Sequence, residues 1–152
     1  MPGLYNCVED DVLAVFNATF NHPSVPVFWR MNDLEVAPDP TTTPLFMRNT
    51  VLFGPESMLA FGGGRGSNEK CLDGFAELVG FASRSKASER ALLDLMADAT
   101  AAFRSKRVVG SYPGGSDLSF TGDGSTFHLQ PEETGNWYLR GCRVFWEYRF
   151  VG

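Results

Sequence analysis

The sequence predicts a single α+β domain with a mixed, mostly antiparallel β-sheet and two main helices packed on one side. Two segments carry apolar residues at helical spacing, and several others alternate apolar with polar residues as strands do. The 16 Gly and 9 Pro among 152 residues indicate many turns. This length suits one domain over residues 1–152, which can bury a core without a metal or a disulfide.

The chain is expected to begin with a helix and a short strand. Apolar residues at helical spacing predict a helix over about residues 7–21, and Asn6 with Glu9 three residues later resembles a capping box. Residues 25–30 are rich in strand formers, but Pro26 cannot donate a hydrogen bond to a ladder. This segment therefore predicts an edge or first strand.

The next predicted strand, residues 45–53, lies between two predicted contact loops, residues 31–44 and 55–68. We expect Gly54-Pro55 to end this strand. The first loop is long for a connection inside a compact domain, which indicates a contact arm or, alternatively, a surface loop without a partner. In the second, the apolar residues 58–61 lead into a Gly-rich tip, which predicts a projecting hairpin whose apolar flank needs a partner.

Residues 70–82 alternate in polarity, but Asp73 and Glu77 interrupt one face, so we expect helices to cover this strand on one side only. A helix capped by Ser85 or Ser88 follows and reaches about residue 103 or 104. Its apolar residues recur at i, i+3, i+4, i+7 and i+11: Leu92, Leu95, Met96, Ala99 and Phe103.

The C-terminal third predicts short strands and one long strand. Val108-Val109 is expected to form a short strand before a turn at residues 112–115. The segments on either side of Gly122-Asp123-Gly124 predict a hairpin. The last strand is expected over residues 137–150, with a bulge near Gly141 where the apolar alternation slips.

No motif predicts a catalytic, cofactor-binding or metal-binding residue, and we do not expect an enzyme. The three Cys residues are too few and too widely spaced for a disulfide framework or a metal knuckle, so they are expected to be buried small hydrophobes. His22 and His128 stand in no recognisable motif. The glycine run at residues 62–66 lacks the Lys-Ser/Thr of a phosphate-binding loop.

The formal net charge of −5 is concentrated in residues 1–64, which hold seven acidic and two basic residues. Such an acidic surface disfavours sequence-specific nucleic-acid binding, because that needs a basic footprint. It suits a surface past which DNA slides without adhering. No apolar run is long enough to span a membrane, and the acidic start is unlike a signal peptide, so we expect a cytosolic product.

The order of these elements resembles the tail terminator proteins of long-tailed (siphovirus-like) phages, the lambda gpU-like group, with its prophage and gene-transfer-agent relatives. The resemblance covers nearly the whole chain. It depends most on residues 59–65 (LAFGGGR), on residues 74–82 leading into the helix at 87–104, and on Trp137-Tyr138 opening the last strand. The length of residues 31–44 and the Gly-Pro content of residues 112–116 depart from this pattern.

The resemblance implies a structural protein of the virion neck, assembled in the host cytoplasm, without a cofactor. Six copies would form a ring on the head-proximal end of the tail tube, stop tube polymerisation and join the tail to the head connector. The expected partners are other copies of this chain, the tail tube protein and the connector or adaptor protein, while DNA passes through the lumen. Interface candidates are Met58, Leu59, Phe61 and Arg65, and candidates for lumen charge are Asp33, Glu35 and Asp39.

Two other classes of protein stay open. Another neck protein, a head-to-tail adaptor or tail-completion protein, would use the same loops. A small ligand-binding or enzymatic α+β domain would instead use an aromatic pocket, and a deep pocket holding His128 with a carboxylate would favour that class.

Overall fold

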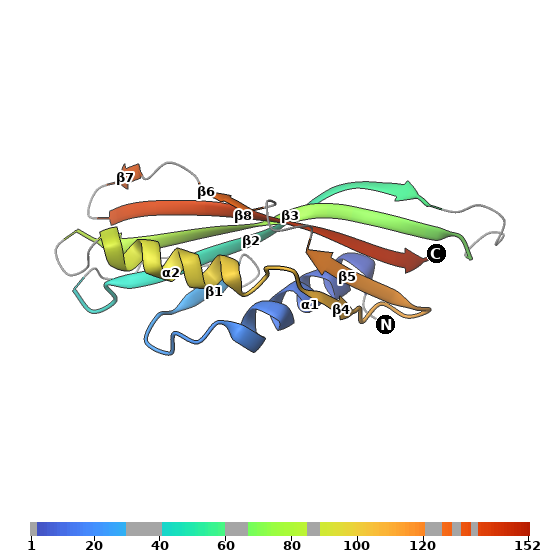
Figure 1. Cartoon of the computed structure of the whole chain (residues 1–152), viewed down its shortest axis with the longest axis horizontal. Coiled ribbons are helices and arrows are strands. Elements are labelled where there is room, and N and C mark those ends of the chain that lie inside the picture. Colours follow the sequence, from blue (N-terminus) through green and yellow to red (C-terminus); the bar gives the residue numbers. More distant parts are fainter. Residues whose placement is uncertain are drawn as a thin grey trace.

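One β-sheet carries both helices on the same face in the computed structural model (Figure 1). The structure describes residues 3–29, 41–59, 67–84, 89–120, 126–128, 132–134 and 137–152, with the backbone alone for 126–128 and 132–134. The elements in chain order are α1 (Leu4–Thr19), β1 (Val27–Trp29), β2 (Leu45–Met58), β3 (Glu69–Ser83), α2 (Glu89–Ala101), β4 (Arg107–Val109), β5 (Ser116–Phe120), β6 (Thr126–His128), β7 (Glu132–Thr134) and β8 (Trp137–Val151).

The sheet is built around its three longest strands, β2, β3 and β8. The strand order is β1-β2-β3-β8-β5-β4, and β6 and β7 also pair with β8. Strand β1 runs parallel to β2 at one edge, and the other described pairings are antiparallel. The predicted α+β class, with a mixed, mostly antiparallel sheet and helices on one side, is confirmed. The predicted edge strand is confirmed as well.

Alternate residues of β3 and β8 separate a buried face from an open face. Facing pairs such as Leu72 with Tyr148 and Leu78 with Cys142 are fully buried. The helices place their apolar stripes on this side: Val8, Val12, Phe16, Leu92, Leu95 and Met96. The odd-numbered residues of β3 and β8, with their partners on β2 and β5, form the open face. The one-sided cover expected for residues 70–82 is therefore confirmed.

Helix α1 begins earlier than predicted, and the predicted capping box is wrong. The helix starts at Leu4, the N-cap Gly3 makes no side-chain cap bond, and Cys7 N donates to Gly3 O over 3.1 Å. Asn6 therefore lies inside the first turn. The helix extends to Leu4, which packs against the core, and this packing outweighs the local capping signal.

Helix α2 agrees with the predicted apolar pattern. Its described residues begin at Glu89, so the predicted Ser85 or Ser88 cap lies outside the described part of the chain. The helix ends at Ala101, and a turn with Ser105 at φ 55° follows it. Phe103 lies beyond the last helical residue and is still fully buried.

Strand β2 continues through Gly54-Pro55, so the predicted end of this strand is wrong. The pairing with β3 shifts register between Phe53 and Glu56 and then resumes to Met58. Pro55 is tolerated because a bulge does not require its missing N–H. A Cβ on Gly54 would lie 2.5 Å from Asp73 Oδ1 and 2.9 Å from the Asp73 carbonyl oxygen, which leaves room for glycine alone.

The predicted hairpin around Gly122–Gly124 is also wrong. Strands β5 and β6 do not pair with each other but follow one another along the same edge of β8, with Phe120 opposite Trp146 and Thr126 opposite Val144. The 15 residues of β8 provide an edge long enough for both. The turn predicted at residues 112–115 is confirmed between β4 and β5, and Gly114 and Gly115 there have φ near +95°.

The bulge expected near Gly141 is absent from the β3–β8 ladder, which pairs without a register shift from Glu69 opposite Val151 to Ser83 opposite Trp137. The apolar alternation slips because Trp137 belongs to an aromatic cluster on the open face. Phe46 stacks on Phe81 there, with 4.5 Å between ring centroids, and Trp137 meets Phe46 edge-on at 5.0 Å. This aromatic cluster on the open face therefore explains why the apolar alternation of β8 changes near Gly141.

The hydroxyl of Tyr148 joins α1, the β4–β5 turn and β8. It donates to Asp11 Oδ2 over 2.8 Å, accepts from Tyr112 N over 3.1 Å and lies 3.2 Å from Ser116 Oγ. Ser111 N donates to the same Asp11 oxygen over 2.8 Å. Burial raises the pKa of the Tyr148 phenol, because the charged form would lose its water, so the group remains a hydrogen-bond donor.

We expect Tyr148→Phe to lower the free energy of unfolding by about 1–3 kcal/mol, because the Asp11 carboxylate and the Tyr112 amide lose a partner. Urea unfolding followed by circular dichroism measures this loss. Tyr5→Phe is the control, since Tyr5 is 53% exposed. Equal unfolding free energies for the two variants would contradict the role given to the Tyr148 hydroxyl.

Candidate assembly surface

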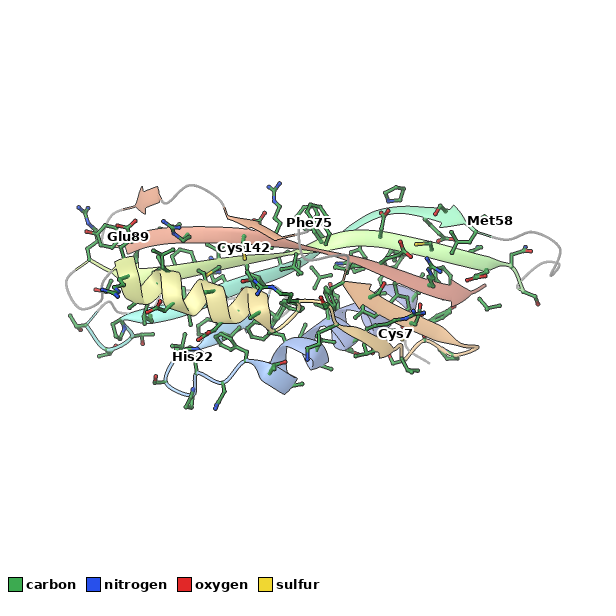
Figure 2. All side chains as sticks on the ribbon, in the orientation of Figure 1. Cys7, His22, Met58, Phe75, Glu89 and Cys142 are labelled. Atoms are coloured by element: carbon green, nitrogen blue, oxygen red, sulfur yellow. The ribbon has the colours of Figure 1, made fainter. Side chains whose placement is uncertain are left out.

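The end of the β2–β3 hairpin carries two of the predicted interface residues. Met58 and Leu59 are 43% and 46% exposed, and Leu59 N donates to Glu69 O over 2.8 Å, which keeps the two strands joined at this point. Strands β2 and β3 continue past the end of α1 here (Figures 1 and 2). The hairpin prediction is confirmed for its described strands, and its end exposes apolar side chains beyond the helices.

The remaining predicted interface and lumen residues lie outside the described part of the chain. These residues are Phe61, Arg65, Asp33, Glu35 and Asp39. The predicted arm over residues 31–44 is described only from residue 41 onward. The roles proposed for these side chains stay predictions from the sequence.

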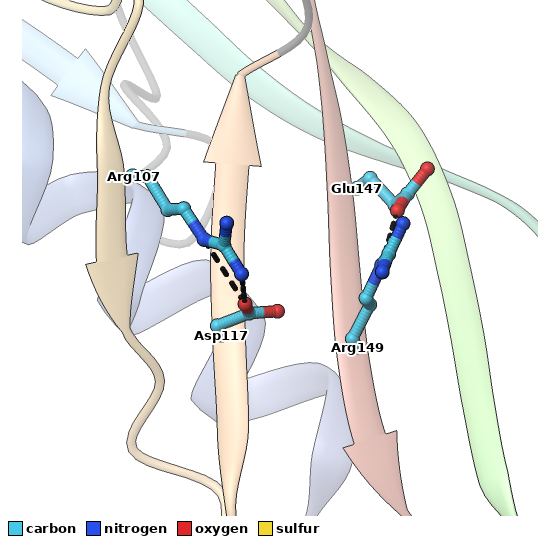
Figure 3. Close-up of polar contacts among 4 residues, drawn as sticks. All are labelled: Arg107, Asp117, Glu147 and Arg149. Atoms are coloured by element: carbon cyan, nitrogen blue, oxygen red, sulfur yellow. Dashed lines mark hydrogen bonds and ion pairs between the residues drawn. The ribbon is translucent and has the colours of Figure 1, made fainter.

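Two ion pairs lie on the open face of the sheet (Figure 3). Arg107 donates to Asp117 Oδ2 through Nε over 3.2 Å and also through Nη2. Arg149 Nε donates to Glu147 Oε1 over 2.7 Å, and this bond together with the charge of Glu147 raises the pKa of Arg149. Because these pairs are largely exposed, they fix side-chain positions more than they stabilise the fold.

A similar arrangement lies farther along β3 and β8. Arg143 Nε donates to Glu77 Oε2 over 3.1 Å, and the Arg143 guanidinium lies 5.0 Å from the centroid of the Phe75 ring. The Phe75 and Phe145 rings face each other on neighbouring strands, with 5.8 Å between their centroids. The open face thus already combines a guanidinium with an aromatic ring and a carboxylate.

A cavity of about 430 Å³ opens where the bulge of β2 meets β3 and β8. Its lining combines aromatic rings, glycines and two carboxylates: Phe53, Gly54, Asp73, Gly74, Phe75, Phe145, Trp146 and Glu147. The sequence does not predict this cavity, because its residues come from three strands. The signal available in the sequence was Asp73, a charge that interrupts an apolar alternation.

A second cavity, about 370 Å³, lies between the end of β8 and the β4–β5 hairpin. It contains Arg107 and Arg149, each already bonded to a carboxylate. Neither of these two cavities is lined by a histidine. His22 instead contacts Asp98 of α2, with 2.7 Å between Nε2 and Oδ2, and the side chain of His128 lies outside the described residues.

The three cysteines are buried free thiols, as predicted. Burial, with smaller contributions from the nearby charges of Glu147 and Asp73, raises the pKa of Cys71 to about 11. Burial also raises the pKa of Cys142 to about 12. Both groups are therefore thiols at neutral pH, and a thiol is a poor nucleophile and a poor metal ligand.

Raising the pH above about 9 should progressively destabilise the protein, because an unfolded thiol ionises near its ordinary pKa of 9.0. Since the folded pKa values of Cys71 and Cys142 are higher, their stabilisation is complete below pH 9 and is lost as the pH rises toward 11–12. Urea unfolding midpoints measured between about pH 9 and pH 12 test this expected loss of stability. The double variant Cys71→Ala, Cys142→Ala should show a shallower decline, and parallel curves would contradict the assignment.

Among the described residues, no group of three or more His, Cys, Asp or Glu residues could hold a metal ion. Neither described helix is long and apolar enough to cross a membrane.

No family model matches this sequence, and no curated protein matches it. Among the fourteen chains of solved structures that match, one, whose name states no function, is 15% identical to this chain. The match covers 95% of this chain and 97% of that chain, with a TM-score of 0.53. At this identity the likeness shows the fold alone.

Proposed function

We propose that this chain is a structural subunit of a phage tail terminator. Six copies form a ring at the head-proximal end of the tail tube, stop its polymerisation and offer a surface to the head connector. The observation that carries the proposal is the apolar end of the described β2–β3 hairpin, where Met58 and Leu59 are exposed and the strands continue past α1 (Figure 2). The resemblance of nearly the whole chain to this family supplies the identity of the assembly.

A ring needs a contact between two different surfaces of each copy, so that each subunit binds the next head to tail. The hairpin end is one such surface, because it extends past the helical layer and bears apolar side chains. The receiving surface is the open face of the next copy, which no described helix covers. The acidic residues 33, 35 and 39 then keep the lumen electronegative, so that DNA passes without adhering.

Native mass spectrometry and electron microscopy of tube ends test the proposal directly. Six copies of the 16.7 kDa chain should give a species of about 100 kDa, alone or on tail tubes, and a ring should cap one end of each tube. A monomer that ignores tubes but binds the portal side would instead identify a head-to-tail adaptor. A monomer that binds neither would contradict a role in the neck.

The double variant Met58→Ser, Leu59→Ser should weaken ring assembly at least tenfold, about 1.4 kcal/mol, while leaving the monomer folded. Leu93→Ser is the matched control, because Leu93 is 41% exposed but lies on α2. Analytical ultracentrifugation measures assembly, and thermal unfolding checks the monomer. Equal assembly by the double variant and the control would exclude the hairpin end as an interface.

A further inference from the structure

The open face of β3 and β8 contains one facing pair in which both side chains are carboxylates. Glu77 faces Arg143 and bonds to it, and the next pair is Phe75 with Phe145. The following pair on the same face is Asp73 with Glu147. Two like charges directly opposite one another on neighbouring strands are destabilising, so this position is unlike its neighbours.

Glu147 already has a cationic partner, but Asp73 has none among the described residues. Arg149 lies one face position farther along β8 and bonds to Glu147 over 2.7 Å. The Asp73 side chain is exposed, and its Oδ1 atom lies close to the backbone of Gly54 at the bulge. One carboxylate at the mouth of the cavity is therefore available to a cation from outside.

Aromatic rings form much of the wall beside this carboxylate. The cavity is lined by Phe53, Phe75, Phe145 and Trp146, and of these the Phe75 and Phe145 rings share the open face with Asp73. Faces of aromatic rings attract cations, and the attraction grows when the cation is partly removed from water.

We propose that this cavity, between the bulge of β2 and strands β3 and β8, binds a guanidinium group. The group lies against the Phe75 and Phe145 rings and pairs with the Asp73 carboxylate. A guanidinium fits better than an ammonium, because it is planar, stacks on rings and bonds carboxylates through a fork of N–H groups. The protein already uses this arrangement on the other side of Phe75, where Arg143 lies over the ring and bonds to Glu77.

The guanidinium group has two possible sources, a free small molecule or an arginine of another polypeptide. Arg65 of a second copy is such an arginine, and it is the single charged residue in residues 59–68. This source depends on the proposed ring, whereas the site itself does not. Both sources present the same guanidinium group, so separate measurements distinguish a free molecule from Arg65.

The first experiment titrates the full chain with N-acetyl-arginine amide and follows backbone amide and indole resonances by NMR. We expect saturable shifts at Asp73, Gly74 and Trp146, and none with the uncharged isostere N-acetyl-citrulline amide. Asp73→Asn should weaken binding about fivefold, since it removes an exposed charge partner. Asp117→Asn, at a carboxylate outside this cavity, should bind like the wild type.

The Asp73→Asn variant is expected to unfold at the same temperature as the wild type or higher, because it relieves the repulsion from Glu147. Weaker binding in a protein of unchanged stability therefore reports on the site. Equal binding of the arginine and citrulline compounds, or equal affinities of Asp73→Asn and Asp117→Asn, would overturn the proposal.

The second experiment separates the two sources by sedimentation of Arg65→Gln, Asp73→Asn and the double variant. If a second copy supplies the guanidinium, both single variants weaken self-association and the double variant is no worse than either, because the pair acts as one unit. If a free molecule supplies it, self-association is unchanged while the titration still saturates. If the titration shows no binding, the guanidinium site is contradicted even where a ring forms. The site and the proposed ring are therefore tested independently.

Discussion

Burial of one face of the β3–β8 ladder is the constraint on which the rest of the structure depends. These two strands pair without a register shift over 15 residues, so every second side chain points to the same side along their whole length. Both helices lie on that side, and Gly80 lets α2 approach, since a Cβ there would come within 2.7 Å of Leu92 and Met96. The registers of β2 with β3 and of β5 with β8 then determine which side chains of β2 and β5 point toward the helices.

The opposite face of the same ladder has no described helix to cover it and is stabilised by its own side chains. Near Trp137 these are stacked aromatic rings, and toward Arg149 they are ion pairs. The open face is therefore apolar near Trp137 and charged toward Arg149. The two carboxylates Asp73 and Glu147 face one another, instead of pairing with opposite charges, at the point where the bulge of β2 opens a cavity.

The two features offered as functional lie on the same strands and outside the helical layer. The hairpin end with Met58 and Leu59 is apolar, and the cavity at Asp73 is acidic and aromatic. A subunit of a ring needs two different surfaces, one that projects and one that receives it. The hairpin end fits the projecting surface, and the cavity lies on the receiving face. The helices, the buried face and the Tyr148 network then act as a rigid support that holds both surfaces at fixed positions.

Local patterns in the sequence determined the apolar face of α2, the glycine turn at residues 112–115, the burial of the cysteines and the exposed apolar residues Met58 and Leu59. These features depend on residues close together in the chain, where periodicity and turn chemistry act directly. Only the tertiary structure decided that β5 and β6 share one edge of β8, that β2 continues through Pro55, and that Asp73 faces Glu147. Register between distant strands is set by which side chains the helices bury, and no short segment contains that information.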